Sequence, residues 1–310
     1  MKLRTCIAQY LRLKRVLGFR FHAEAVILRA FGQATGPVEL GRVTPERVRR
    51  YLDGPGPVTR FWERKWVTLR GFYRFALARG LVRRSPLPTV LPKRLPSFVP
   101  YIYSHDELRR LLASIPTEPL AGLSAPTLRT LVLLLYGAGL RISEALALTQ
   151  EDVDLGSRLL TIHQSKFFKS RWVPVGCQLA KVLAQYRQQH IPRRRGLGHP
   201  FFQTVAGRPI HRAVAERAFR VLRQAAGIKR ANTARYQPRL HDLRHTFAVH
   251  RLVAWYRQGA EVQRLLPKLC TYLGHVDLTA TQRYLTLTPE LSELASRRFE
   301  RYARTGGDHD

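Results

Sequence analysis

A stretch dense in prolines, RRSPLPTVLPKRLPSFVPY, is the feature that most restricts how this chain can fold. It runs from Arg83 to Tyr101 and holds five prolines. Proline lacks a backbone donor and clashes with the preceding helical turn, so no continuous helix can pass through this stretch. Apolar residues recur at helical spacing on both sides of it. The sequence therefore predicts a helical domain over residues 1–92, an extended basic linker over 93–103 and a second domain over 104–310.

The first domain is expected to be helical throughout. The segment TPERVRRYLDG has Thr and Pro at its start and stops at Gly54, as a helix with both end signals does. In RFWERKWVTLRGFYRFALARG, one face carries Trp62, Trp66, Leu69 and Tyr73. We interpret this face as part of the core rather than as a platform for stacking bases.

The second domain is predicted to be mainly α with a small antiparallel sheet, so the fold class of the whole chain is mainly α. Ser104 and Glu107 have the spacing of a capping box. The apolar segment 125–148 indicates a buried helix that breaks around Gly137 and Gly139 and then resumes. RLLTIH and RWVPV read as two strands of a hairpin joined by QSKFFKS. Further helices are predicted over 179–190, over 213–226, within PRLHDLRHTFAVH and around LLPKLCTYLGH.

Net charge is the unusual number in the composition. Lys and Arg total 53 against 21 for Asp and Glu, which gives +32 at pH 7 and a pI near 11.3. Such an excess repels itself unless a polyanion is bound, and nucleic-acid-binding domains commonly show a pI above about 9. An arginine-rich proteome is the alternative explanation. We expect double-stranded DNA as the partner.

Cysteine usage and hydropathy bear on the compartment. Cys6, Cys177 and Cys270 are far apart and form no CxxC pair, which favours a reducing compartment and argues against a thiolate metal site. The N-terminus lacks the apolar core of a signal peptide. The most apolar run, Leu131 to Leu140, is too short to span a bilayer. We therefore expect a soluble, cytoplasmic protein that does not enter the membrane.

Four stretches of the second domain carry side chains suited to chemistry on a phosphate. GAGLRISEAL, SKFFKS, HDLRHTFA and LGHVDLTATQRYL supply, in order, Arg141 with Glu144, Lys166, His241 with Arg244, and His275 with Tyr284. Each alone is a weak signal, since an Arg-x-x-Glu pair is usually a surface contact. Their joint occurrence in this order is much more specific.

This set resembles the tyrosine recombinase, or phage integrase, family over roughly residues 104–302. The resemblance implies a helical core-binding domain, of the SAM-like type, followed by an α-rich catalytic domain. It implies a site-specific recombinase or integrase that cuts and rejoins DNA through a 3′-phosphotyrosyl intermediate, as in integration, excision or transposition. The ending YLTLTPELSELASRRFERY is more similar to integrases carried by transposons than to those that resolve chromosome dimers.

The resemblance gives Tyr284 the role of nucleophile. A phenol has a pKa near 10, so it needs a proton acceptor, and we expect His241 to serve. The guanidiniums of Arg141 and Arg244 suit the two non-bridging oxygens of the phosphate, whose charge grows in the transition state.

Three further residues complete the expected site. Lys166 is the predicted general acid for the leaving 5′-hydroxyl. The bulky Phe167 and Phe168 beside it leave Lys169 as the alternative. His275 would donate a hydrogen bond to the phosphate, and Glu144 would orient Arg141.

Basic residues outside this set are candidates for contacts with DNA phosphates. They are Arg60, Arg64, Lys65, Lys93, Arg94, Lys169 and Arg171. The resemblance also implies a homo-tetramer on two synapsed sites or an assembly with other recombinases. The amphipathic tail ELSELASRRFERYA is predicted to dock on a neighbouring protomer or, alternatively, to pack on its own domain.

Other functions stay open at this point. His241 and His245 have the His-x3-His spacing of zinc helices, but the glutamate that zinc proteases need is missing and Arg244 lies between them. We therefore expect no metal and no cofactor, and we expect His245 to pack against the core or support His241. A DNA-binding protein that has lost activity and a type IB topoisomerase are the remaining alternatives.

Overall fold

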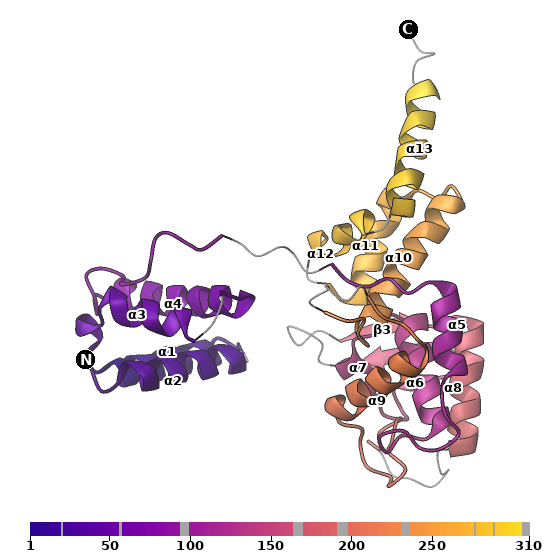
Figure 1. Ribbon diagram of the computed structural model, residues 1–310, viewed down its shortest axis with the longest axis horizontal. Coiled ribbons are helices and arrows are strands. Elements are labelled where there is room, and N and C mark those ends of the chain that lie inside the picture. The colour runs from indigo at the N-terminus through magenta and orange to yellow at the C-terminus, as the bar shows by residue number, and fades with distance from the viewer. Residues whose placement is uncertain are drawn as a thin grey trace. The chain divides into compact units, whose positions relative to one another are not determined.

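The chain forms two compact units, residues 1–98 and residues 99–310 (Figure 1). Their described residues form three hydrophobic cores, one in the first unit and two in the second. These two compact units are described one at a time. The computed structural model describes residues 1–19, 21–55, 58–93, 99–163, 170–190, 198–230, 236–275, 277–287 and 289–305.

The first unit is helical in its described residues, as predicted. Its elements are α1 (Leu3–Val16), α2 (His22–Thr35), the 3-10 turn η1 (Leu40–Arg42), α3 (Pro45–Asp53) and α4 (Arg60–Ala78). The side chain of Thr44 accepts a hydrogen bond from the Arg47 amide, and Pro45 occupies the first turn of α3. On α4, Trp62, Leu69 and Tyr73 of the predicted core face are buried, whereas Trp66 is only partly buried against the same core.

The second unit is mainly helical with one small sheet, which confirms the predicted fold class. Its elements are α5 (His105–Ala113), α6 (Ala125–Gly137), α7 (Ile142–Ala147), β1 (Val153–Asp154), β2 (Leu159–Ile162), β3 (Arg171–Pro174), α8 (Cys177–His190), α9 (Arg212–Ala225), α10 (Asp242–Arg257), α11 (Val262–Leu273), α12 (Thr279–Gln282), the 3-10 turn η3 (Arg283–Thr286) and α13 (Pro289–Thr305).

The sheet contains the predicted hairpin. Strand β2 pairs antiparallel with β3, with Leu160 opposite Val173. Both side chains are buried, and the alternation along β2 leaves its other face partly exposed. The short strand β1 adds an outer strand to β2, which the sequence pattern was too brief to indicate.

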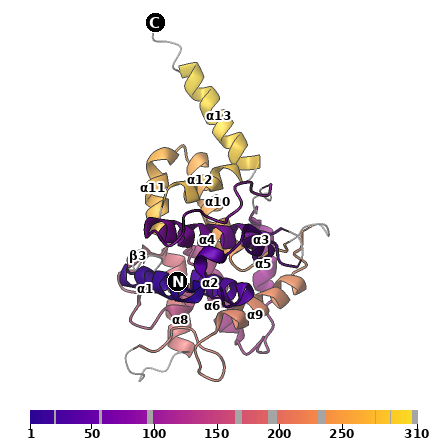
Figure 2. The same cartoon turned by 90° about the vertical axis from the view of Figure 1, so that its left-hand side faces the viewer.

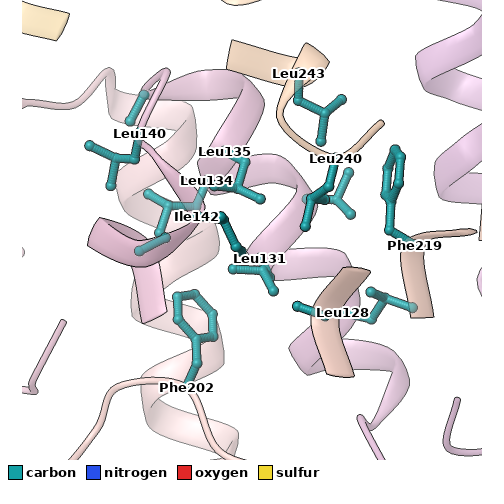
Figure 3. Close-up of a cluster of buried hydrophobic side chains, with 14 of the residues drawn as sticks. Leu128, Leu131, Leu134, Leu135, Leu140, Ile142, Phe202, Phe219, Leu240 and Leu243 are labelled. Carbon is teal, nitrogen blue, oxygen red and sulfur yellow. The ribbon is translucent and has the colours of Figure 1, made fainter. Parts of the chain in front are cut away.

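Helix α6 lies at the centre of the larger core of the second unit (Figure 3). Leu134 of α6 lies beside Ile142 of α7, and Phe219 of α9 lies on the other side of α6. The predicted break after α6 is present, because α6 ends at Gly137 and α7 begins at Ile142. The break exposes backbone carbonyls in the middle of an otherwise apolar region, and these carbonyls become part of the site.

The residues just before α5 belong to the second unit, although the sequence analysis assigned them to the linker. Tyr103 is completely buried. Its amide donates to Thr246 Oγ1, and its hydroxyl donates to the carbonyl of Arg239. The proline pattern does not reveal this packing, because an extended segment can be solvated or buried with the same composition.

A smaller core joins α10, α11, η3 and the first turns of α13. Leu291 of α13 is fully buried there, and Glu290 pairs with Arg257 of α10. The rest of α13 extends away from the other helices of this unit in both views (Figures 1 and 2). Among the described residues, no helix is long and apolar enough to cross a membrane.

Candidate active site

Three arginines surround one carboxylate in the second unit. Glu144 accepts hydrogen bonds from Arg141 Nη1 at 2.7 Å and from both terminal nitrogens of Arg171, at 3.0 and 2.9 Å. Arg244 Nη1 lies 3.8 Å from the same carboxylate. Glu144 therefore orients Arg141, and it also holds Arg171.

The break between α6 and α7 brings Arg141 and Glu144 together. Arg141 is the N-cap of α7, and its amide donates to Glu144 Oε2 at 2.9 Å. Gly139, just before it, has φ +59°, a conformation that glycine adopts without strain. A Cβ there would lie 2.4 Å from Phe247 Cδ1, so a side chain would push α10 away.

Backbone carbonyls fix the directions of the two guanidiniums. Arg244 donates to the carbonyls of Gly139 at 2.7 Å and Leu273 at 2.6 Å. Arg141 Nη2 donates to the carbonyl of Gly274 at 2.8 Å. These bonds tie the α6–α7 break, the start of α10 and the end of α11 to one another. A guanidinium has five N–H donors, so both arginines keep donors for another acceptor.

Electrostatics leave this cluster with an excess of positive charge. Burial alone would raise the pKa of Glu144, but hydrogen bonds and charge from Arg171 and Arg141 lower it to about 2. Burial and the neighbouring Arg141 lower the pKa of Arg244 to about 10, so it stays cationic at neutral pH. One carboxylate thus faces three cations, and an anion would complete the balance.

The hydroxyl of Tyr284 reaches this cluster from η3. The Tyr284 side chain is only 3% exposed, and its hydroxyl lies 3.1 Å from His245 Nδ1. The ring of His275 stacks against the Tyr284 ring with 6.0 Å between centroids. Burial raises the pKa of Tyr284, while the charge of Arg244 and a hydrogen bond from it act in the opposite direction.

His245 and His275 border the nucleophile candidate, His241 lies against His245, and all three imidazoles are held neutral. Burial, followed by nearby positive charge, lowers the pKa of His241 to about 4, of His245 to about 3 and of His275 to about 4. His275 is oriented through Nδ1, which lies 2.8 Å from Thr281 Oγ1. His241 contacts His245 edge to face, with 4.9 Å between ring centroids.

The structure therefore brings together five of the six predicted catalytic residues: Arg141, His241, Arg244, His275 and Tyr284. The predicted general acid Lys166 and its alternative Lys169 lie outside the described residues, as does Arg94. His245 contacts His241, which matches one of the two expectations for it. Its bond to Tyr284 was missed, although its place four residues after His241 put it on the same helical face.

The candidate DNA contacts fall into two groups. Arg60, Arg64 and Lys93 are exposed in the first unit. Arg60 and Lys93 line a groove there that also contains Trp62 and Trp66. These three remain candidates.

The predicted DNA contacts Lys65 and Arg171 are wrong, because both side chains bind groups inside the protein. Lys65 is buried, and its ammonium donates to the carbonyls of Tyr51 at 2.6 Å and Leu52 at 2.5 Å. Arg171 donates to Glu144 and to the carbonyl of Tyr272 at 2.9 Å. Charge in the sequence does not reveal that carbonyls and a carboxylate in the interior already occupy these donors.

The described residues do not supply a set of ligands for the zinc site considered as an alternative. Within the part of the chain that the structure describes, no three His, Cys, Asp or Glu residues gather closely enough to hold a metal ion. His245, the second ligand of that alternative, uses Nδ1 for the bond to Tyr284.

Comparison with known proteins gives consistent matches. The phage integrase family matches residues 102–290. A putative integrase/recombinase, y4rB of Sinorhizobium fredii, is 34% identical over 96% of this chain and 97% of its own length. The tyrosine recombinase XerC of Chlorobaculum tepidum is 33% identical over 82% of this chain and 79% of its own length.

Solved structures share the fold at lower identity. The Tn1549 transposon integrase in complex with transposon right end DNA matches with a TM-score of 0.72 and 16% identity, over 98% of this chain and 100% of that one. A lambda integrase tetramer bound to a Holliday junction matches with a TM-score of 0.66 and 17% identity, over 90% of this chain and 79% of that one.

Proposed function

Since this chain belongs to the phage integrase family of tyrosine recombinases, and is thereby a site-specific recombinase, we propose that it cuts and rejoins DNA through a covalent 3′-phosphotyrosyl bond to Tyr284. One observation carries the proposal. Two guanidiniums with fixed directions and the hydroxyl of a buried tyrosine meet at a single cluster with excess positive charge.

A phosphodiester is the anion that fits this cluster. Arg141, Arg171 and Arg244 share one carboxylate, so the charge of a bound phosphate would offset the remaining excess. Guanidiniums bind phosphate oxygens through paired N–H groups and remain charged at any working pH. The donors of Arg141 and Arg244 that do not bind carbonyls serve the two non-bridging oxygens, and these contacts strengthen as charge develops in the transition state.

The covalent step needs a nucleophile, a general acid for the leaving oxygen and an acceptor for the phenolic proton, which an imidazole beside Tyr284 supplies. The Tyr284 oxygen attacks phosphorus, the bond from phosphorus to the 5′-oxygen breaks, and the 3′-phosphate stays on the tyrosine. Lys166 donates the proton that the 5′-oxygen requires. His241 and His275 complete the set at the phosphate. The reverse attack by a 5′-hydroxyl restores the DNA, so the cycle needs no external energy source.

We assign contact with duplex DNA to both units. In the first unit, which would act as the core-binding domain, Arg60, Arg64 and Lys93 provide exposed positive charge for phosphates. Such contacts position the protein without reading sequence. Assembly as a tetramer on two synapsed sites, alone or with other recombinases, follows the solved structure of lambda integrase on a Holliday junction. The likeness to a transposon integrase motivates a mobile element as the natural substrate.

Trapping of the covalent intermediate tests this function. The protein is incubated with nicked duplexes that carry the ends of the element encoding it, so that the short strand 3′ of the cut diffuses away and rejoining fails. We expect a protein–DNA adduct that survives denaturation. The Tyr284→Phe variant should bind the same DNA and form no adduct, because it lacks only the phenolic oxygen.

Tyr136→Phe is the matched control. Tyr136 also has a hydroxyl bonded to a histidine of α10, but it lies outside the arginine cluster. This variant should form the adduct at nearly the wild-type rate. DNA binding without adduct formation by the wild-type protein would instead identify an inactive DNA-binding protein, and an adduct that persists in Tyr284→Phe would eliminate Tyr284 as the nucleophile.

A further inference from the structure

The histidine that contacts the nucleophile is not the one expected from the sequence. His245 Nδ1 lies 3.1 Å from the Tyr284 hydroxyl, and the two ring centroids are 5.6 Å apart. His241, the predicted proton acceptor, contacts the His245 ring instead. Both histidines belong to the start of α10, where His241 is the N-cap and His245 lies one turn later.

The protonation states of His245 and Tyr284 limit the possible directions of this hydrogen bond. The groups that face His245 are His241, Arg244, Arg239 and His275, together with Tyr284. Burial and these neighbours keep the imidazole neutral, and burial keeps Tyr284 protonated. A neutral imidazole has one N–H and one bare nitrogen, and in the tautomer that carries its proton on Nε2 the phenol donates and Nδ1 accepts. In this tautomer the lone pair that receives the phenolic proton is already aligned with it.

We propose that His245 is a catalytic residue that accepts the proton of Tyr284 as the phenolic oxygen attacks the phosphate. This inference rests on the proposed function. The O–H bond of Tyr284 breaks, an N–H bond forms at His245 Nδ1, the oxygen bonds to phosphorus and the 5′-oxygen leaves with a proton from the general acid. When the 5′-hydroxyl attacks in the reverse step, His245 returns its proton to the tyrosine.

Bound DNA changes the strength of this base. Arg244, the first of the two arginines that disfavour a charged imidazole at His245, would also hold the phosphate. A phosphodiester placed between Arg141 and Arg244 adds a negative charge within a few ångströms of His245. An opposite charge at that range favours the imidazolium. His245 is thus a poor base in the free protein and a better one when a phosphate is bound.

Substitution by asparagine separates proton transfer from simple positioning. The Oδ1 atom of an asparagine can occupy nearly the place of His Nδ1 and accept a hydrogen bond, but it cannot take a proton at working pH. His245→Ala removes both functions. The measurement is the single-turnover rate of adduct formation on the nicked duplex between about pH 6 and 9.

We expect both variants to lose at least ~100-fold in rate near neutral pH, the range typical of general base catalysis. Their rates should rise with pH across this interval more steeply than the wild-type rate, because hydroxide must then remove the proton. Added imidazole should restore part of the rate of His245→Ala and leave Tyr284→Phe inactive. An asparagine variant within ~5-fold of wild type would overturn the proposal and leave His245 a positioning role only.

The chain offers a close control on the same helix. His250 Nδ1 lies 3.0 Å from the hydroxyl of Tyr136, burial lowers its pKa to about 4, and it has no contact with the arginine cluster in the described residues. His250→Asn should keep a rate within ~3-fold of wild type. A loss equal to that of His245→Asn would mean that damage to α10 explains both, which would also overturn the proposal.

The experiment distinguishes failure of the proposed function from failure of the role of His245 alone. No adduct with wild-type protein would refute the proposed function and this role together. A normal adduct with wild-type protein, combined with a fast His245→Asn variant, would refute only the role of His245. DNA affinity and thermal unfolding, measured for each variant, identify any that has lost its fold. If His245→Ala is such a variant, the asparagine rate and its pH dependence decide.

Discussion

Glu144 is the carboxylate that all three arginines of the site share. It accepts hydrogen bonds from the Arg141 amide and from the side chains of Arg141 and Arg171. Removal of one partner from a buried ionic cluster leaves the other charges without compensation. The stability of the second unit and the geometry of the site therefore rest on the same carboxylate.

Replacement of Glu144 by Gln should change the pH dependence of stability. The pKa of Glu144 in the folded protein is about 2, below the ordinary value of 4.5. A lowered pKa stabilises the fold above the unfolded pKa, and this contribution disappears as pH falls from about 4.5 toward 2. We expect Glu144→Gln to lose about 3 kcal/mol near pH 7 and progressively less below pH 4.5, as measured by denaturant unfolding.

Glu216→Gln provides the control for this experiment. Glu216 forms an exposed pair with Arg212 one turn away on α9. Its replacement should alter the unfolding free energy by less than about 0.5 kcal/mol at every pH. A loss in Glu144→Gln that is the same at pH 7 and pH 3 would contradict the assignment of the pH effect to this carboxylate.

At this scale the sequence predicted the identities of the site residues better than their contacts. The resemblance to the tyrosine recombinases placed Arg141, Arg244, His275 and Tyr284 in one site, and the structure brings the four together. The partner of each donor could not be predicted, because it depends on which carbonyls a broken helix exposes. Lys65, a candidate DNA contact in the sequence, shows the same limit, since its ammonium binds two carbonyls in the interior.

At the scale of the elements, the buried ammonium of Lys65 on α4 caps the last turn of α3. The carbonyls of Tyr51 and Leu52 belong to the last turn of α3 and accept hydrogen bonds from it. Lys65→Met should lower the unfolding free energy of the first unit by about 1–3 kcal/mol, since both acceptors lose their partner. DNA affinity should change by less than about 3-fold once the protein is folded, as measured by fluorescence anisotropy.

Arg64→Met is the matched variant for that prediction. Arg64 is the neighbouring residue, exposed, with a surface pair to Glu24. It should leave the unfolding free energy within about 0.5 kcal/mol of wild type and weaken DNA binding, as loss of a phosphate contact does. If Lys65→Met instead weakened DNA binding and left the unfolding free energy unchanged, Lys65 would be a DNA contact after all.

A further prediction concerns Gly139 in the break between α6 and α7. Gly139 combines a positive φ with a close approach to Phe247, and its carbonyl holds Arg244. Gly139→Ala should destabilise the second unit by roughly 2–4 kcal/mol, the sum of backbone strain and overpacking. It should also slow adduct formation more than it weakens DNA binding, because Arg244 loses its anchored direction.

Gly176→Ala tests whether this effect is local. Gly176 has no heavy atom within 4 Å of the added Cβ and no left-handed φ. Its substitution should be nearly neutral in thermal unfolding. A Gly139→Ala variant as stable as Gly176→Ala would mean that the break relaxes without cost and that the glycine is dispensable.

The elements themselves were largely predictable. The core face of α4, the break after α6 and the β2–β3 hairpin follow from apolar periodicity and glycine placement. Strand β1 and helix α12 were missed, because two and four residues are too few to show a period. The burial of Tyr103 was missed for a different reason, since its partners Arg239 and Thr246 lie more than a hundred residues away.

For the molecule as a whole, net charge predicts how binding depends on salt. The chain carries +32 at pH 7. A protein that neutralises six to ten phosphates loses roughly 10³–10⁵ in affinity between about 50 and 200 mM salt. We expect this chain to fall in or above that range on a non-specific duplex, measured by titration at several salt concentrations. A loss below about 10-fold would mean that most of its basic residues do not contact phosphates.

The buried state of Tyr284 has a consequence for a protein that encounters so much non-cognate DNA. A strongly cationic chain binds chromosomal duplex at many sites, and a permanently exposed, ionised phenolate would cleave the DNA at each of them. Under the proposed function, the Tyr284 oxygen stays buried and hydrogen-bonded to His245 until a phosphate enters the arginine cluster. Encounters with duplex DNA that do not place a phosphate there would therefore leave the strand intact, with no separate inhibitor needed.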